Sequence, residues 1–577
     1  MARSATILRF LSLLVGVFLL TVVGISHFGA KQVDELVPEH LAGVIEYVSD
    51  GLYHLERGRV RTLPLGRRVE VSDVRIVVDS ARFRQLVARD SVPDRLFDLR
   101  MKKLIITGIR WEDLYFRKKF FCKEIDLEGL TVQVETGLGS APFRLRKPQN
   151  KFHLAGAEVG ILQAAQMNFS LLHHNRRDTL RAFSHNGLLQ GTHIRWTPDA
   201  LPAFETLTLT LGATALQLPR TRNEYSARGW QLDFKEPVFR MSGFRFRQWL
   251  PDTVRATRHD LDITLLEARG LGKLAPPNAE FFSLRNLRLF EPRVVATTTR
   301  QPGVSFSATP KEFPRKLLQK AGFPLLLEEI QIAQGAVRYE ETRQETGRTG
   351  VVLFDNLSGN MGPVWLAPRP QSVPPAPMQV RLAGHFQNRS LIAVKGQFDA
   401  QDSGQRFHLR AKVSRLSAGQ IRDLAANLGH LRIQELELDS LLFDCRGNRQ
   451  AIQATLRLAY RDLTVKLLRY DTAQKRLRQQ PMLSLFANEL VLHADNPEAG
   501  RPLRVVQTTY VPPITQPFFG ALWRTLFTGI RQTVIADPSL LQYMQQKAAT
   551  RTERKEERLR RREDRRRRRE SKDGLIF

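Results

Sequence analysis

Short runs in which apolar and polar residues alternate constrain the fold of this chain more than any other feature. An apolar side chain at every second position is the period of a β-strand with one buried face. Clear runs are TLTLTLG with Leu207, Leu209 and Leu211, MQVRLAG with Val380 and Leu382, FHLRAKV with Leu409 and Val413, and DLTVKLL with Leu463 and Val465. We therefore expect a mainly β protein, whose sheet has one apolar and one polar face.

A second pattern within these runs is apolar, any, apolar, two residues, then Gly, Pro or Leu, any, apolar. It occurs at Ile125–Val132, Leu287–Val294, Ile330–Val337 and Leu436–Phe443. The step of three reverses the apolar phase, which a strand accommodates through a bulge or a tight turn. Each copy is predicted to be two strand pieces joined by a kink. The first two copies extend back to Gly108 and Gly270, 162 residues apart, which indicates a duplicated unit; chance recurrence is the alternative.

The segment Phe10–Phe28 contains no Asp, Glu, Lys or Arg. About 20 apolar residues cover the roughly 30 Å hydrocarbon core of a bilayer as one helix. The alternative, a cleaved secretory signal, fits less well, because the run is long and no small-residue cleavage site follows it. Arg3 and Arg9 precede the run, which favours a cytoplasmic N-terminus. We expect a single-pass anchor within residues 1–30 and the bulk of the chain in a periplasm.

The chain is strongly basic, with 88 Lys and Arg against 58 Asp and Glu and a net charge of +30. Such a balance calls for an anionic partner, and nucleic acid is the default partner for a soluble protein. A chain held outside the cytoplasm meets anionic lipid or lipopolysaccharide instead. We therefore expect membrane phospholipids and no nucleic acid as partners. The run Arg551–Glu570 is interpreted either as a solvated tail or as a contact with anionic head groups.

The composition changes at several points, which divide the chain into successive regions. The expected regions after the anchor are a juxtamembrane helix at 31–53, a first β region with the duplicated unit at 54–364, a proline-rich break at 365–377, a second β region at 378–512, C-terminal amphipathic helices at 513–549 and a basic tail at 550–577. The break is interpreted as a loop or a domain boundary. Short helices are expected at Pro314–Ala321 and Ser417–Leu428.

The segment Pro517–Ile535 predicts an amphipathic helix. Its apolar stripe includes Phe519, Trp523, Leu526 and Phe527, while its arginines lie off that stripe. A helix rich in Trp and Phe with cations on its other side suits a membrane interface. A cap packed over the end of the sheet explains the same pattern equally well. The four residues are candidates for membrane contact under the first interpretation.

No known catalytic or cofactor-binding motif occurs in the chain. GxxxxGK[ST], GxGxxG, HExxH, GxSxG and paired CxxC are all absent. We therefore expect no enzyme, no cofactor and no metal site. The two cysteines, Cys122 and Cys445, each lie in an apolar run. We favour two buried free thiols over a disulfide between them.

The organisation of the chain resembles that of a known family. The segments that carry the resemblance, besides the N-terminal anchor, are IQIAQGAVRYEE, LAYRDLTVKLL, LSLFANELVLHAD and PFFGALWRTLFTGIRQTV. Together they resemble the AsmA-like proteins of Gram-negative envelopes, especially Bacteroidetes-type members, over roughly Ile7–Ile535. The basic tail departs from that pattern. The resemblance implies an inner-membrane anchor and an elongated periplasmic β-sheet groove with an apolar interior. It also implies a role in phospholipid transfer and outer-membrane assembly.

These expectations lead to two functional hypotheses. The first is a non-enzymatic lipid-handling protein, in which the leucines and valines of the four alternating runs face lipid. The second is a structural or assembly factor with a fully packed core, whose basic faces bind envelope proteins or lipopolysaccharide. About 25 strands stacked at about 4.8 Å give a body on the order of 120 Å long.

Overall fold

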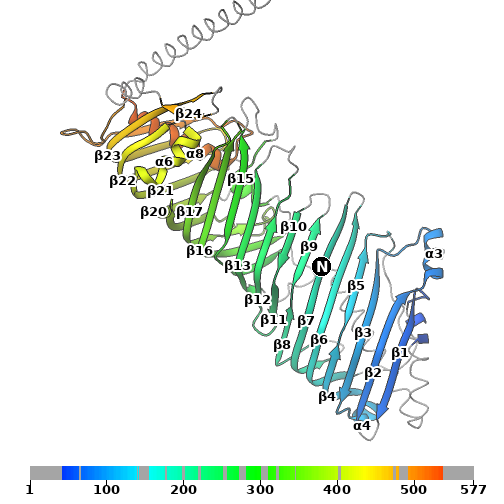
Figure 1. The fold of residues 1–577 in the computed structure, drawn as a ribbon. Coiled ribbons are helices and arrows are strands. Elements are labelled where there is room, and N and C mark those ends of the chain that lie inside the picture. Colours follow the sequence, from blue (N-terminus) through cyan, green and yellow to red (C-terminus); the bar gives the residue numbers. More distant parts are fainter. Residues whose placement is uncertain are drawn as a thin grey trace, which may run out of the picture.

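The computed structural model describes residues 42–536 with internal gaps, of which the longest are 142–154, 272–280, 301–309 and 480–491. The protein is mainly β, with one long curled sheet and a few short helices. Its strands stack along one long axis, from β1 at the blue end to β23 near the orange end (Figure 1). The expected anchor, most of the juxtamembrane helix, residues 537–549 and the basic tail lie outside the described residues.

The first half of the sheet contains long strands and pairs of shorter ones. Its elements are β1 (Tyr53–Leu63), β2 (Arg68–Val78), α3 (Ser80–Ala88), β3 (Arg95–Thr107), α4 (Trp111–Arg117), β4 (Lys119–Glu128), β5 (Thr131–Thr136), β6 (Gly156–Asn175), β7 (Asp178–Trp196), β8 (Thr206–Leu211), β9 (Thr214–Leu218), β10 (Asn223–Ala227), β11 (Gly229–Asp233), β12 (Val238–Arg247) and β13 (Arg258–Leu271). No helix in the described part of the chain is long and apolar enough to span a membrane.

The second half continues the same sheet and carries the remaining helices. Its elements are β14 (Phe282–Phe290), β15 (Arg293–Arg300), α5 (Pro314–Gln319), β16 (Leu325–Arg343), β17 (Thr349–Gly362), β18 (Val364–Trp365), β19 (Met378–Phe386), β20 (Ser390–Phe398), β21 (Phe407–Ser417), α6 (Ala418–Gly429), β22 (Leu431–Gly447), β23 (Ile452–Asp471), β24 (Arg476–Gln479), β25 (Val505–Tyr510) and α8 (Phe518–Val534). The expected helices at Pro314 and Ser417 correspond to α5 and α6, with ends that differ by one or two residues.

The two segments that carry the 162-residue offset have the same local arrangement. In the first, β4 and β5 lie between antiparallel β3 and parallel β6. In the second, β14 and β15 lie between antiparallel β13 and parallel β16. Gly108 and Gly270 both have positive φ, and a Cβ on them would collide with the Cβ atoms of Lys123 and Arg285, which are again 162 residues apart. The offset therefore relates two structurally equivalent pieces of sheet.

The reversed apolar phase marks places where the strands bend, as the recurring motif predicts. At Gly129 and at Glu291 the strand breaks into two pieces, β4 with β5 and β14 with β15. The third and fourth copies are instead register shifts inside the continuous strands β16 and β22. The prediction of kinks is confirmed, and bulges replace breaks in the later copies.

These kinks belong to a line of irregularities that crosses most of the sheet. The positions of positive φ on this line are Asp73, Gly129, Gln166, Asn186, Gly243, Glu291, Gln334 and Asn356. Each lies at a corresponding place in the strand register, between the last pair before a shift or break and the first pair after it, and the strands β3, β8 to β11 and β13 carry none of these eight positions. Because a bulge bends its strand and increases the local twist, irregularities repeated at corresponding places in many strands curl the part of the sheet that the line crosses. We call this feature the bulge line.

One expected boundary is wrong, and at a second the structure decides between the two interpretations. Tyr53 is the first residue of β1 and not the end of a helix. The proline-rich segment 366–377 is a loop within one sheet and not a domain boundary, because β17 and β19 on its two sides pair directly. A single core cluster, which includes Ala268 and Val465, extends across it. Burial of apolar side chains on both sides of the loop makes the two expected β regions one body.

Candidate functional site

One face of the sheet carries an unbroken row of mostly apolar residues, which we call the first row. Its members, in strand order, are Val60, Val71, Leu104, Leu127, Ala164, Leu189, Leu209, Leu232, Phe239, Ala268, Leu287, Ile330, Met361, Val380, Gly396, Leu409, Cys445, Ala454 and Thr508. Each is the direct cross-strand partner of the next, and direct partners face the same side of a sheet. The row runs without a break from β1 to β25.

A second row lies on the other side of the bulge line. Its members are Phe97, Val134, Leu171, Ala182, Leu216, Tyr225, Phe246, Leu261, Val294, Val337, Phe354 and Phe386. Residues of the two rows belong to the same core clusters: Phe97 clusters with Leu127, and Phe386 with Val380. Both rows therefore lie on one face, which we call the inner face. The bulge line runs between them and brings the two halves of this face together.

Burial along the rows is uneven. The first row is buried at its ends, at Val71 and Leu104 near β1 and at Cys445 and Ala454 near β25. Between these ends its members are mostly half-buried, from Leu189 in β7 to Leu409 in β21. In the second row, the side chains from Ala182 to Phe386 are likewise half-buried. The middle of the inner face is thus apolar without being fully packed by the described residues.

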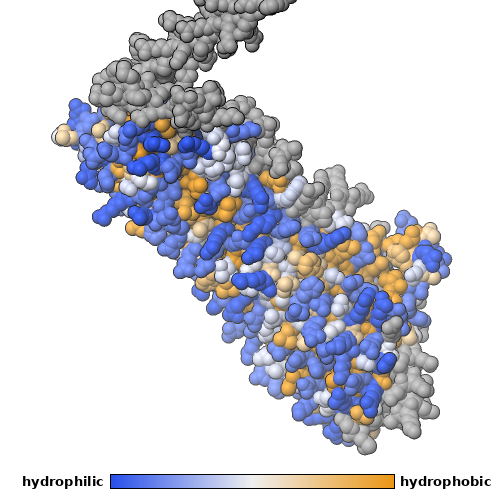
Figure 2. All heavy atoms as spheres, viewed as in Figure 1, coloured by the Kyte–Doolittle hydropathy of each residue, from blue (hydrophilic) through white to orange (hydrophobic). Residues whose placement is uncertain are grey.

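The opposite, outer face is polar along the same strands. Its residues beside the first row are Arg240, Glu267, Arg288, Gln331, Asn360, Arg381, Lys395, Arg410 and Asp444, which are again successive cross-strand partners. Arg410 donates to Asp444 over 2.6 Å, and Arg240 donates to the buried Glu267 over 2.9 Å. Hydrophilic side chains predominate on the side of the molecule seen in Figure 2. The sheet therefore separates an apolar face from a charged one.

The lipid-facing candidates from the sequence fall into two groups. Six are half-buried on the inner face, namely Leu207, Leu209, Val380, Leu382, Leu409 and Val413. The other three, Leu211, Leu463 and Val465, are buried. Leu463 and Val465 belong to the core at the β23 end of the sheet, where they pack against other protein side chains. Alternation alone identified their face but not this local covering.

Two helices cover parts of the inner face in the second half. Helix α6 contacts both β17 and β22, although β19, β20 and β21 lie between those strands. The 12 residues of α6 span about 18 Å, which matches about four strand spacings. Its Ala426 is buried and its Ile421 packs against the core. Helix α6 therefore lies across the sheet at one end of these strands.

Helix α8 covers the inner face at β23 and β25. The side that it buries is made of small residues, Ala521, Thr525, Gly529 and Thr533, spaced four apart. A Cβ at Gly529 would lie 3.2 Å from Leu456 Cδ2, so the helix backbone approaches the sheet closely. The buried threonine hydroxyls donate to carbonyls one turn back, which satisfies their polar groups. Of the two interpretations of this helix, the cap over the sheet is therefore confirmed.

The membrane-contact candidates on α8 are divided by this packing. Leu526 packs against the core and faces the sheet side. Phe519, Trp523 and Phe527 are 77%, 49% and 55% exposed. The helix thus packs its small residues on the sheet and presents its aromatic residues to the opposite side. Its half-buried leucines lie between these two sides.

An aromatic cluster closes the edge of the inner face beside α8. Phe518 contacts Phe313, Phe398 and Phe407, with ring centroids 4.9 to 5.7 Å apart. All four rings are buried. The guanidinium of Arg449 lies 5.1 Å from the Phe313 ring and donates to the Gln516 carbonyl over 3.0 Å. Burial lowers the pKa of Arg449 from its ordinary value. Sequence reasoning missed this cluster, because Phe313 is far from its partners along the chain.

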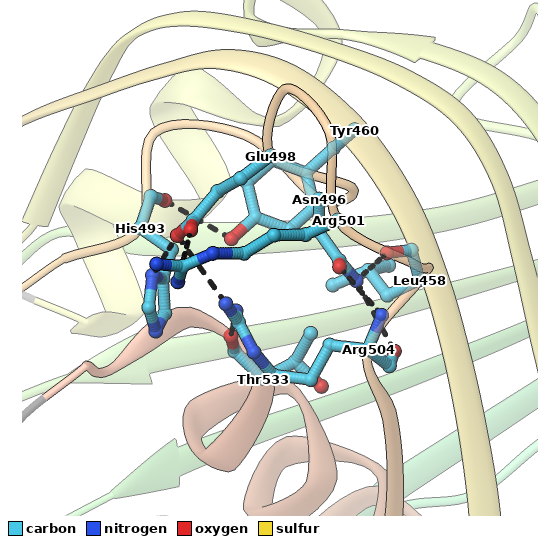
Figure 3. A network of polar contacts seen from close by, with 8 residues as sticks. All are labelled: Leu458, Tyr460, His493, Asn496, Glu498, Arg501, Arg504 and Thr533. Atoms are coloured by element: carbon cyan, nitrogen blue, oxygen red, sulfur yellow. Dashed lines mark hydrogen bonds and ion pairs between the residues drawn. The ribbon is translucent and has the colours of Figure 1, made fainter.

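A polar network fixes the C-terminal end of α8 to the sheet (Figure 3). Arg504 donates to the Thr533 carbonyl over 2.8 Å, and the His493 amide donates to the Val534 carbonyl over 2.9 Å. Glu498 accepts from Arg501 and Arg504 and contacts His493. The hydrogen bond from His493 is the main cause that lowers the pKa of Glu498. These bonds occupy carbonyls that the last helical turn leaves unpaired.

The same network holds the connection that precedes β25. The Asn496 side chain donates to the Leu458 carbonyl over 2.6 Å and accepts from the Arg504 amide over 2.8 Å. Tyr460 donates to the His493 carbonyl, and burial raises its pKa to about 12. Its groups bond one another and the backbone on both sides of α8, so the network acts as a clamp on the helix.

The two cysteines are free and buried, as expected. Cys122 and Cys445 lie in different core clusters near opposite ends of the sheet, and burial raises the pKa of each thiol to about 12. Within the described ranges, no group of three or more His, Cys, Asp or Glu residues is placed to hold a metal ion. The side chains of His173 and His174 bond Thr136 and Glu135. The candidate functional surface is therefore the inner face together with α8.

Comparison of the chain with models of known protein families finds none that matches. A search of curated proteins likewise finds no significant match.

Proposed function

We propose that the protein is a non-enzymatic lipid-handling protein, which holds the acyl chains of phospholipids in a groove formed by the curled inner face. The observation that supports this most is the pair of apolar rows, which flank the bulge line and stay half-buried through the middle of the sheet. Adjacent strands lie about 4.8 Å apart, so the first row, with one residue from each strand that it crosses, extends roughly 85 Å. This length is shorter than the one expected from 25 strands, because several pairs of short strands, such as β4 with β5, lie end to end at one position in the sheet.

The energetics favour an apolar occupant for this surface. Transfer of a methylene group from water to an apolar surface is worth about 0.8 kcal/mol, so an acyl chain laid along half-buried Leu, Ile and Val gains stability with each carbon. The polar outer face keeps the other side of the sheet in water. A groove that is apolar along its length suits an acyl chain, because an acyl chain is apolar throughout and needs no specific polar contact.

The cellular setting is part of the same proposal. The apolar Phe10–Phe28 segment would anchor the protein in an inner membrane, with the sheet in the periplasm and anionic lipid or lipopolysaccharide as a further contact. This organisation is that of an AsmA-like protein of envelope and outer-membrane biogenesis. A reporter active only in the periplasm should function when fused after Ala30 or Phe577. Activity of a cytoplasmic reporter at both points would contradict this setting.

Site-specific crosslinking tests the groove. A photo-crosslinking residue at Leu409 or Leu209 on the inner face should capture phospholipid in the full-length protein, detected by mass spectrometry after purification. The matched controls are Arg410 and Thr208, the next residues on the same strands, which face the other way. Capture at the first pair alone supports the groove. Equal capture at both pairs, or none at Leu409 and Leu209, would contradict it.

The second candidate is a structural or assembly factor of the envelope. Burial of both ends of the first row favours it, because the sheet is a packed core there. A crosslinker at Leu409 that captures only protein side chains or an envelope protein would favour this candidate. The charged outer face, with Arg381 and Lys395 as direct cross-strand neighbours, would then be its binding surface.

A further inference from the structure

Helix α8 has two faces with opposite properties, and only one of them is needed by the fold. After Phe518 at its start, its buried residues are the small Ala521, Thr525, Gly529 and Thr533, and Gly529 lies close to Leu456 of β23. Phe519, Trp523 and Phe527 occupy the other side at intervals of four residues and are the most exposed large apolar residues of the helix. Val511 and Ile514, in the turn before α8, are exposed as well. A folded protein gains nothing from three aromatic side chains in water on one helical side.

The charged residues that α8 and the segment before it contribute are all positive. The segment from Val505 to Val534 contains Arg524 and Arg531 and no Asp or Glu. Both arginines are exposed. Glu498, in the network at the end of α8, is already bound by His493 and two arginines. This surface therefore presents aromatic rings and cations. A partner that binds it must provide an apolar region for the rings and anionic groups for the arginines.

An anionic phospholipid bilayer fits both requirements. Trp and Phe are favoured at the boundary between head groups and acyl chains, where cationic side chains reach phosphates. A second copy of the chain fits less well, because a two-fold contact would place this arginine-bearing surface against itself. The network of Figure 3 and the close packing at Gly529 fix the helix rigidly, so the aromatic side is presented without reorganisation.

We propose that Phe519, Trp523 and Phe527 form a docking surface through which the β25 end of the sheet binds the surface of an anionic phospholipid bilayer. Both the cap and the membrane interpretation of this helix then apply, each to a different face. The inference goes beyond the groove: docking does not require that the inner face hold acyl chains. It gives the molecule a membrane contact at the end of the sheet opposite β1.

An environment-sensitive fluorophore tests the docking. Phe519→Cys is labelled in the full-length protein, which is held in a phosphatidylcholine nanodisc, and phosphatidylglycerol vesicles are then added. Cys122 and Cys445 are 0% exposed, so the label goes to the introduced thiol. Leu391→Cys is the matched control, an apolar residue 61% exposed on the outward side of β20. We expect a blue shift and brighter emission at position 519, none at 391, and a weaker response with phosphatidylcholine vesicles.

Substitutions separate the two contributions. Trp523→Ser with Phe527→Ser should weaken vesicle binding by at least about tenfold, since full burial of one large apolar side chain is worth a factor of that size. Arg524→Glu with Arg531→Glu should reduce the preference for anionic vesicles and the sensitivity to salt. Leu391→Ser with Leu442→Ser, on the outer face, should leave binding unchanged.

Three results would overturn the inference. They are no spectral change at position 519 with vesicles, an equal change at 391, or a change at 519 that only a lipid-free protein fraction induces. The last would assign the surface to a protein partner. Docking and the groove are tested by different residues and readouts, so failure at Phe519 leaves the crosslinking result at Leu409 intact, and the reverse holds too.

Discussion

Phe518 and Phe519 are consecutive residues whose ring centroids lie 5.5 Å apart, yet Phe518 is 5% exposed and Phe519 is 77% exposed. The first ring completes the aromatic cluster with Phe313, Phe398 and Phe407 at the edge of the inner face. The second begins the exposed aromatic side of α8. One peptide bond thus separates the packing function of this helix from the surface proposed for membrane docking.

The close approach of α8 to β23 predicts a strong dependence on residue size at Gly529. Gly529→Leu should destabilise the protein by about 1 to 3 kcal/mol, because the new side chain must displace Leu456 or the helix. Gly520→Ala is the control on the same helix, where an added Cβ has no contact shorter than 3.5 Å. It should stabilise by about 0.5 to 1 kcal/mol through helix propensity. Thermal unfolding of the full chain in detergent measures both. Equal effects would show that α8 does not depend on this contact.

The sequence predicted α8 as one apolar stripe, but the structure divides that stripe. A period of 3.6 residues places Phe519, Leu522, Trp523, Leu526 and Phe527 on a common side. It does not say where the sheet lies relative to that side. The close contact is made by Ala521, Thr525 and Gly529, which carry little hydrophobic signal. Small residues mark a close approach only when the opposing surface is known, and that surface is formed by strands distant in sequence.

The same limit applies to the sheet. Local alternation identified which residues of a strand share a face, and the phase reversal near Gly129 and Glu291 identified where strands bend. The bulge line and the two rows depend on registers between strands, such as that of Leu232 with Phe239 and Ala268. Registers are set by non-local pairing, which one sequence does not show. Leu463 and Val465 illustrate the consequence, since their face was predicted but their burial at the covered end was not.

The buried thiols predict a chemically inert pair. Because burial raises the pKa of Cys122 and Cys445 to about 12, almost no thiolate forms at neutral pH. Native protein should therefore react with a maleimide at neither position, and both should react fully once guanidinium unfolds it. Mass spectrometry of the labelled protein counts the modified thiols. Rapid modification of either cysteine in the native state would contradict the packing at that end of the sheet.

The clamp on α8 predicts a loss of order in acid. The pKa of Glu498 is lowered in the folded protein, chiefly by its hydrogen bond with His493. Its stabilising effect is therefore complete above the ordinary carboxyl pKa near 4.5 and is lost as the pH falls through the lowered value. Amide hydrogen exchange in the last turn of α8, corrected for its intrinsic pH dependence, should rise across that interval.

Glu498→Gln should raise the same exchange at neutral pH and leave little further change on acidification. The control is Glu128→Gln, a carboxyl group whose pKa is also lowered, by Lys102, but which lies in the β3–β5 region of the sheet. It should leave exchange in α8 unchanged at every pH. If acid and Glu498→Gln both leave α8 protected, the helix is held by its apolar contacts alone.

The repeated arrangement around Gly108 and Gly270 predicts matched costs of substitution. Each has φ near +70°, and a Cβ would lie 2.5 Å from the Lys123 Cβ or 2.8 Å from the Arg285 Cβ. Gly347 has a similar φ of +64° but no atom within 4 Å of an added Cβ. Gly347→Ala should therefore cost only the backbone strain of about 1 to 2 kcal/mol.

Gly108→Ala and Gly270→Ala should each cost more than Gly347→Ala, by about 1 kcal/mol or more, since a flanking strand must shift as well. The two should also resemble each other, because the same strand order surrounds both positions. Thermal unfolding of the three variants in one buffer gives the comparison. If Gly270→Ala destabilises the protein no more than Gly347→Ala does, the flanking strand moves aside without a loss of stability. The glycine is then required by its backbone conformation alone, and the structural equivalence of the two segments does not extend to their energetics.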